Sequence, residues 1–284
     1  MRESDNFKAL KGILEYKMRM IDASREKQNG HSDFVTQMED LWAFLRSQNS
    51  PSGEYHAVYE EFQNSDFYPA ARSHLRRAQE EYETLIEIDD VNELLEYKTS
   101  KRLDFKAFNA AIKNRYDQDT FRSSEEEMTA VMEELGDQKP PRKLVMVGCG
   151  PLAQTLLYFS LTFSETRCIG IDNNPVAIEF ARNLKQHFQL ENTDYEVCNA
   201  VEYRFDDFDV IFVANFAAPK FRILQRIAET APNAPLVVVR LPVLYSNLFY
   251  DSVEYKLIGN LRVLREMPVN PRMMNKTVLL KRPS

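Results

Sequence analysis

Two glycines and an aspartate are spaced as in a nucleotide-binding unit. Gly148 and Gly150 follow the apolar run 143–147, and glycine lets a backbone turn sharply and approach a ligand closely. A helical stretch comes next, and a second apolar run ends at Asp172. This acid lies about 20 residues past the turn, where a ribose diol needs a hydrogen-bond acceptor. The order of strand, turn, helix, strand and acid therefore predicts a βαβ unit that binds an adenosine-type cofactor.

The turn departs from the full dinucleotide fingerprint. Pro151 follows the second glycine, and Ala153 stands where G-x-G-x-x-G has its third glycine. No G-x-x-x-x-G-K-[ST] phosphate loop occurs in the chain. A structural βαβ turn without a ligand is therefore the alternative. A terminal aspartate that binds ribose suits S-adenosylmethionine as well as it suits NAD.

Further polar residues follow the later expected strands. These strands cover residues 195–198, 208–214 and 236–241. Asn199 and Asn215 come at the ends of the first two, and Arg240 lies within the third. Ligands gather at the carboxyl ends of the strands in open α/β sheets. We therefore expect these three side chains on the same rim as the glycine turn.

Two cationic residues near this rim have two interpretations each. Arg240 interrupts an apolar strand, and a buried arginine needs an anionic partner. The partner is either an acidic side chain of the fold or the carboxylate of a substrate or cofactor, which fits the guanidinium fork. Lys220, after residues 215–219, either binds a carboxylate in the same way or lies in solvent at a helix start.

The elements that position these residues fall into two parts. Residues 1–137 are poor in glycine and carry apolar residues at helical spacing. The expected helices cover residues 7–23, 34–46, 55–62, 70–88, 105–116 and 123–135. Strands and helices then alternate, and the chain closes with an expected hairpin of residues 261–266 and 277–282. This order predicts an α/β fold: an all-helical N-terminal domain (1–137) before a Rossmann-like class I methyltransferase sheet (138–284), whose seven strands end in an antiparallel hairpin.

Composition excludes several classes of protein. The chain has 284 residues, 44% of them hydrophobic and 28% charged, which is ordinary for a globular protein. Its net charge of −7 disfavours a nucleic-acid partner. No apolar run is long enough to cross a bilayer, and the N-terminus lacks the apolar core of a signal peptide. We expect a cytoplasmic protein with three reduced cysteines, and no metal site, because no Cys or His pair has ligand spacing.

Four segments resemble the nicotianamine synthase family. They are the G-x-G-P-L turn at 148–152, the Asn-Phe-Ala-Ala-Pro-Lys segment at 215–220, the stretch from Arg240 to residue 250, and the closing strand at 274–278. The resemblance covers residues 65–282 and includes the helical layout before the sheet. The length is most similar to that of bacterial aminobutanoyltransferases of staphylopine-type metallophore pathways.

The resemblance implies an activity and a set of site residues. S-Adenosylmethionine serves as co-substrate: its 3-amino-3-carboxypropyl (aminobutanoyl) group passes to the α-amine of an amino acid, histidine by resemblance, and 5′-methylthioadenosine leaves. The residues expected to hold the cofactor are Gly148, Gly150, Pro151, Asp172, Asn173, Asn199 and Asn215. Those expected at the substrate are Arg240, Lys220 and Phe108. By position in its helix, Glu83 matches the catalytic glutamate, with Glu80, Glu81 and Glu87 close enough to leave the register open.

Two parts of the chain depart from the family pattern. Phe108 stands where nicotianamine synthases have a tyrosine, and phenylalanine cannot donate a hydrogen bond. Residues 151–155 read Pro-Leu-Ala-Gln-Thr in place of Pro-Leu-Pro-Leu-Thr. The first departure favours a relative that transfers one group to a different amino-acid acceptor. A homodimer through the helical half is expected by resemblance.

Other functions fit the same sheet, because a fold does not fix a function. The first alternative is a small-molecule methyltransferase, which would release S-adenosylhomocysteine instead of methylthioadenosine. A second is a binding protein that senses a nucleotide without turnover. A third, an NAD dehydrogenase, is disfavoured by the missing third glycine.

Overall fold

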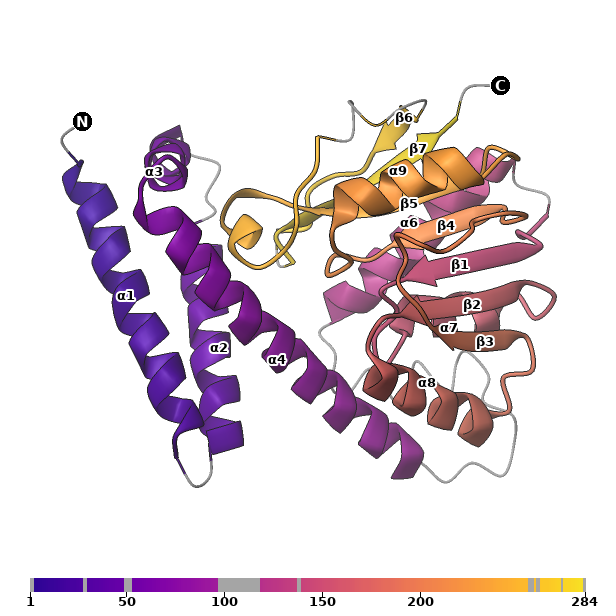
Figure 1. Cartoon of the computed structure of the whole chain (residues 1–284), viewed down its shortest axis with the longest axis horizontal. Helices are drawn as coiled ribbons and strands as arrows, with labels where there is room; N and C mark the ends of the chain where they lie inside the picture. Colours follow the sequence, from indigo (N-terminus) through magenta and orange to yellow (C-terminus); the bar gives the residue numbers. More distant parts are fainter. Residues whose placement is uncertain are drawn as a thin grey trace. The chain divides into compact units, whose positions relative to one another are not determined.

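A computed structural model of the chain describes residues 3–27, 30–48, 53–96, 118–136, 139–254, 258, 261–271 and 273–282 (Figure 1). The chain forms two compact units, each built from separate segments. The first unit comprises Met1–Glu83, Pro242–Tyr250 and Pro271–Asn275; the second comprises Thr84–Leu241, Asp251–Asn270 and Lys276–Ser284. The helix expected at 105–116 lies outside the described residues.

The first unit is helical, as the spacing of its apolar residues predicts. Its elements are α1 (Asp5–Arg25), α2 (Gly30–Gln48), α3 (Gly53–Gln63) and the first part of α4 (Phe67–Glu96). Ser4 caps α1, because its hydroxyl accepts a hydrogen bond from Phe7 N at 3.2 Å. The buried side chains of α1 and α2 recur every three or four residues and include Phe7, Leu10, Leu14, Ile21, Phe34, Met38, Leu41 and Leu45.

A segment from late in the chain completes the core of the first unit. It contains the short 3-10 helix η1 (Leu244–Leu248). The ring of Tyr245 is fully buried and meets that of Tyr59 edge-on at 4.9 Å. Phe249 stacks on Trp42 with ring centroids 4.6 Å apart. The units therefore differ from the division expected at residues 137 and 138, which stays a prediction about domains.

The second unit contains a seven-stranded sheet with the predicted topology. The strands are β1 (Lys143–Val147), β2 (Arg167–Asp172), β3 (Thr193–Val197), β4 (Val210–Val213), β5 (Leu236–Pro242), β6 (Arg262–Glu266) and β7 (Asn275–Lys281). Their order is β3-β2-β1-β4-β5-β7-β6 (Figure 1). β1 to β5 pair in parallel, whereas β6 and β7 form an antiparallel hairpin. The fold class is confirmed.

Helices cover both faces of this sheet. They are α6 (Gln118–Leu135), α7 (Gln154–Thr162), α8 (Pro175–Phe188) and α9 (Lys220–Thr230), with the last turns of α4. Leu144 and Met146 of β1 belong to one core cluster, with apolar residues of α4, α6, α7 and α8. Val145 and Val147 belong to a second cluster, with residues of α9. Burial of alternate side chains on both faces explains why the central strands are continuous apolar runs.

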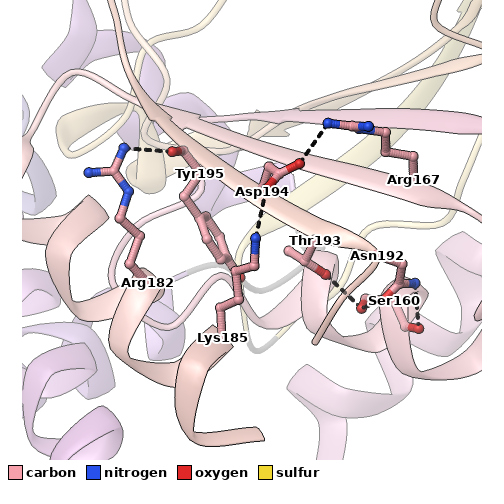
Figure 2. A network of polar contacts seen from close by, with 8 residues as sticks. All are labelled: Ser160, Arg167, Arg182, Lys185, Asn192, Thr193, Asp194 and Tyr195. Carbon is pink, nitrogen blue, oxygen red and sulfur yellow. Dashed lines mark hydrogen bonds and ion pairs between the residues drawn. The ribbon is translucent and has the colours of Figure 1, made fainter. Parts of the chain in front are cut away.

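Polar side chains fix the edge strand β3. Asp194 lies between Lys185 and Arg167 (Figure 2). It accepts hydrogen bonds from Lys185 Nζ at 2.7 Å and from Arg167 at 2.8 Å. These hydrogen bonds, led by that from Lys185, lower the pKa of Asp194. Arg182 of α8 donates to the carbonyl of Tyr195 at 2.8 Å. Because the ion pairs are largely exposed, each contributes about 0–1 kcal/mol. They join β3 to α8 and β2.

No helix in the described residues is long and apolar enough to cross a membrane.

Candidate functional site

The turn after β1 requires glycine at two positions. Gly148 and Gly150 have φ angles of +70° and +67°, in the left-handed region that side chains disfavour. Gly148 N donates to the carbonyl of Ile171 at 2.9 Å, which ties the turn to the end of β2. Pro151 is buried within the turn. Ala153, in place of the fingerprint's third glycine, is itself left-handed at φ +47° and directly precedes α7 as its N-cap residue.

Asp172, the predicted ribose acceptor, holds the turn in place. One carboxylate oxygen accepts from Gly150 N at 3.0 Å and the other from Asn174 N at 2.9 Å. The carboxylate is partly buried, whereas Asn173 beside it is exposed. Each carboxylate oxygen can accept more than one hydrogen bond. Asp172 therefore keeps acceptor capacity for a diol, and its role toward ribose stays a prediction.

A second carboxylate, from α4, reaches the same turn. Oε2 of Glu87 lies 3.5 Å from Leu152 N. A Cβ atom added to Gly150 would lie 2.5 Å from this oxygen, so glycine is needed there for close approach as well as for its φ angle. From the sequence, Glu87 was noted only as a neighbour of Glu83. Its spacing was a signal, since residues four apart share one face of a helix.

The cysteine of the turn is not a nucleophile. Cys149 is buried, and its thiol pKa is raised well above the ordinary value, by burial first and then by the charges of Asp172 and Glu87. A thiol reacts as its thiolate. Cys149 therefore stays protonated, and the chemistry of this turn is left to carboxylates, backbone amides and a ligand.

Lys220 lies in the interior, so the interpretation of a solvated lysine at a helix start is wrong. Its side chain is fully buried, and Nζ donates to the carbonyls of Asn215 at 2.7 Å and Asp251 at 3.1 Å. Its backbone N–H donates to the carboxylate of Asp251 at 2.9 Å. These contacts fix the loop between β4 and α9. A role for Lys220 at the substrate stays a prediction.

Asn215, at the end of β4, offers an open acceptor. Its Oδ1 atom is buried and has no hydrogen-bond partner in the described part of the chain. A buried unpaired acceptor carries a free-energy cost that a ligand donor can relieve. The same loop lies against the glycine turn, because a Cβ added to Gly148 would meet the Cβ atom of Ala217 at 3.3 Å. Binding of the cofactor by Asn215 stays a prediction.

Arg240 has an anionic partner within the second unit. Its guanidinium donates to both carboxylate oxygens of Glu127, at 2.9 and 2.6 Å, and to the hydroxyl of Thr155 at 2.7 Å. Thr277 donates to the same carboxylate at 2.6 Å, and Glu127 is 1% exposed. The structure thus contains the ion pair of the first interpretation. A role for Arg240 at a substrate carboxylate stays a prediction.

Asn199 is exposed and closes a local turn after β3. Its Oδ1 accepts from Val201 N at 3.2 Å, and its amide donates to Glu202 at 3.4 Å. Its role at the cofactor stays a prediction. Phe108 lies outside the described residues. In the described part of the chain, no group of three or more His, Cys, Asp or Glu residues is placed to hold a metal ion.

Glu83 belongs to a hydrogen-bonded chain inside the first unit. Its Oε1 accepts from the Tyr250 hydroxyl at 2.5 Å and from the Gln79 amide at 2.9 Å. Gln79 in turn accepts from Trp42 Nε1 at 2.7 Å. Burial raises the pKa of the Glu83 carboxyl, and the hydrogen bonds from Tyr250 and Gln79 offset part of that rise. A carboxyl with a raised pKa is suited to accepting a proton.

Comparison with known proteins supports this fold. Residues 143–242 match the model of a methyltransferase domain. No curated protein matches. Among solved structures, the chain is similar to the nicotianamine synthase MtNAS, in a glutamate-to-glutamine mutant in complex with S-adenosylmethionine. The TM-score is 0.68 and the sequence identity is 16%, and the match covers 95% of this chain and 98% of that chain. MtNAS in complex with MTA and tNA is similar with a TM-score of 0.61 and 15% identity, over 89% and 98% of the two chains. The predicted resemblance to nicotianamine synthases is thus confirmed in the fold, whereas the link to staphylopine-type enzymes stays a prediction.

Proposed function

We propose that this chain is an S-adenosylmethionine-dependent transferase that moves the aminobutanoyl group to the α-amine of an amino acid. The observation that carries the proposal is the likeness to MtNAS bound to S-adenosylmethionine, which covers 95% of the chain and so includes the helical segments as well as the sheet. The glycine turn with Asp172 supplies the features that an adenosine cofactor requires.

The reaction is a substitution at the γ-carbon of the methionine moiety. The lone pair of the acceptor amine forms the new C–N bond while the C–S bond breaks, and the electron pair of that bond goes to sulfur, which leaves as methylthioadenosine. The amine must be neutral to attack and loses a proton as the bond forms. Glu83, whose carboxyl pKa is raised by burial, is proposed as the group that accepts this proton.

Histidine is the acceptor that we propose, by resemblance to enzymes that make opine-type metallophores. Phe108 in place of the family's tyrosine supports an acceptor other than that of nicotianamine synthases. The residues that we propose to act at the substrate are Arg240, Lys220 and Phe108. Arg240 can do so only if its ion pair with Glu127 rearranges.

Mass spectrometry of the purified chain with S-adenosylmethionine and a pool of amino acids tests the proposal. We expect methylthioadenosine, together with one amino acid that has gained an aminobutanoyl group. S-Adenosylhomocysteine as the by-product would instead support a small-molecule methyltransferase, which the match of residues 143–242 to a methyltransferase domain favours as the second candidate. Cofactor binding with no by-product from any amino acid would instead favour a binding protein that senses a nucleotide without turnover.

A further inference from the structure

Two carboxylates meet the glycine turn from different elements, and they bind it differently. Asp172, at the end of β2, accepts short hydrogen bonds from Gly150 N and Asn174 N. Glu87, on α4, lies at a longer 3.5 Å from Leu152 N and directly over Gly150, where a Cβ atom would be 2.5 Å from its Oε2. Asp172 therefore holds the backbone of the turn through short hydrogen bonds, whereas the contact between Glu87 and Leu152 N is longer.

The pair of carboxylates makes the turn electronegative. Both charges help to raise the pKa of the buried Cys149 thiol, after burial itself. An uncharged nucleoside needs only one acceptor for its ribose diol, which Asp172 can supply. A second negative charge at the same turn suits a ligand that also carries a positive charge, because opposite charges a few ångströms apart attract strongly in a partly buried site.

We propose that Glu87 binds the α-ammonium group of the methionine moiety of S-adenosylmethionine. The choice of S-adenosylmethionine as the ligand of this turn rests on the proposed function. A ligand bound along this turn meets both carboxylates at Gly150, so that Asp172 takes the ribose and Glu87 the amino-acid end. Glu83 and Glu87 then have separate tasks, although only one helical turn separates them on α4.

This assignment gives Glu87 a positioning role in the transfer. The ammonium group is attached to the carbon chain that is transferred, two carbons from the reacting γ-carbon. Fixing both the ribose and the ammonium leaves the γ-carbon few orientations, which favours an in-line attack by the amine.

The test compares three uncharged-sulfur ligands by calorimetry: S-adenosylhomocysteine, its deaminated analogue 5′-(3-carboxypropylthio)adenosine, and methylthioadenosine. The first two differ only in the ammonium group. We expect the wild-type chain to prefer S-adenosylhomocysteine over the deaminated analogue by about tenfold or more, the usual effect of a hydrogen bond between charged groups. Glu87→Gln should abolish this preference and leave the affinity for methylthioadenosine within about twofold of wild type, since glutamine keeps the shape of the turn.

Two variants serve as controls. Glu81→Gln makes the same charge change on the exposed side of α4, where Glu81 pairs with Arg25 at 2.6 Å, and should keep the wild-type preference. Asp172→Asn should lower the affinity for all three ligands, because all three contain the ribose that Asp172 is expected to bind. The assignment would be overturned if Glu87→Gln keeps the preference for S-adenosylhomocysteine. It would also be overturned, in favour of a structural role, if the affinities for all three ligands fall equally.

The two proposals fail in different experiments. If the chain prefers the amino ligand through Glu87 but converts S-adenosylmethionine to S-adenosylhomocysteine, the aminobutanoyl transfer is wrong and the role of Glu87 stands. If methylthioadenosine is the by-product and Glu87→Gln keeps the preference, the transfer stands and the role of Glu87 is wrong.

Discussion

Glu83 is a carboxyl whose environment favours accepting a proton. It is held by Tyr250 at 2.5 Å and by Gln79 at 2.9 Å, and burial raises its pKa. Both contacts lie within the first unit, and both join residues that the sequence analysis did not pair. The position of Glu83 was predicted from a resemblance, whereas its partners required the structure.

Glu83→Gln should slow transfer far more than it weakens cofactor binding. Glutamine can still accept the hydrogen bond from Tyr250 but cannot take a proton, so we expect the rate to fall by about 10²–10⁴-fold. Single-turnover kinetics with S-adenosylmethionine, alongside calorimetry of cofactor binding, measure the two effects. Glu81→Gln on the same helix is the matched control, and a wild-type rate in Glu83→Gln would assign the proton to another group.

Tyr250→Phe should shift the pH dependence of the reaction upward. The hydrogen bond from Tyr250 lowers the pKa of Glu83, so its removal raises that pKa further. Because Glu83 must be ionised to accept a proton, the acidic limb of the kcat/KM profile should move to higher pH. Tyr245→Phe is the control, since the Tyr245 hydroxyl has no partner in the described residues. If the acidic limb does not move in Tyr250→Phe, that limb does not report the ionisation of Glu83.

At the scale of elements, one buried polar cluster joins α6, α7, β5 and β7. It consists of Glu127, Thr155, Arg240 and Thr277, with the guanidinium of Arg240 bound to both carboxylate oxygens of Glu127. Thr155 lies in the first turn of α7, directly after the glycine turn. The cluster therefore holds the helix that follows the turn against the sheet.

Glu127→Ala should strongly destabilise the second unit. Removal of one partner leaves the guanidinium of Arg240 buried without its counter-charge, which costs about 3–5 kcal/mol. Urea unfolding followed by circular dichroism measures the loss of stability. Glu126, an exposed neighbour in the same helix, provides the control, since Glu126→Ala should change the free energy of unfolding by about 0.5 kcal/mol or less. Equal effects of the two substitutions would show that the buried pair does not stabilise the fold.

The sequence predicted elements better than partners, and the reason is physical. Apolar spacing located α1, α2 and the strands of the sheet, because periodicity reflects a local choice of which face is buried. The pairs Arg240–Glu127 and Tyr250–Glu83 join residues 113 and 167 positions apart. Nothing local in those segments specifies such partners. The same limit hid Glu87, whose importance depends on the turn that it approaches.

At the scale of the whole chain, the two compact units share the polypeptide in an interleaved way. Residues 242–250 and 271–275 belong with the helices of residues 1–83, although the strands between and around them belong with the sheet. Tyr245, Leu248 and Phe249 are each at most 1% exposed and complete the helical core. Sequence order alone predicted a single boundary, since composition changes only once along the chain.

A fragment of residues 1–137 should therefore fail to fold. It contains the helices of the first unit but lacks Tyr245 and Phe249, which pack on Tyr59 and Trp42. Loss of these rings costs the helical core several kcal/mol of apolar burial, comparable with the stability of a small domain. Near-ultraviolet circular dichroism and a thermal melt of the fragment, beside the full chain, provide the measurement. A cooperative melt of the isolated fragment would contradict the role of the returning segment.

The protonation of the Cys149 thiol affects how readily S-adenosylmethionine could alkylate and inactivate the protein. A sulfonium compound is an alkylating agent, and a thiolate is the side chain most readily alkylated. The glycine turn holds a cysteine beside the proposed cofactor site, yet burial and the two neighbouring carboxylates keep that sulfur protonated. The charges that we propose to attract a cationic ligand thus also protect the turn against self-inactivation.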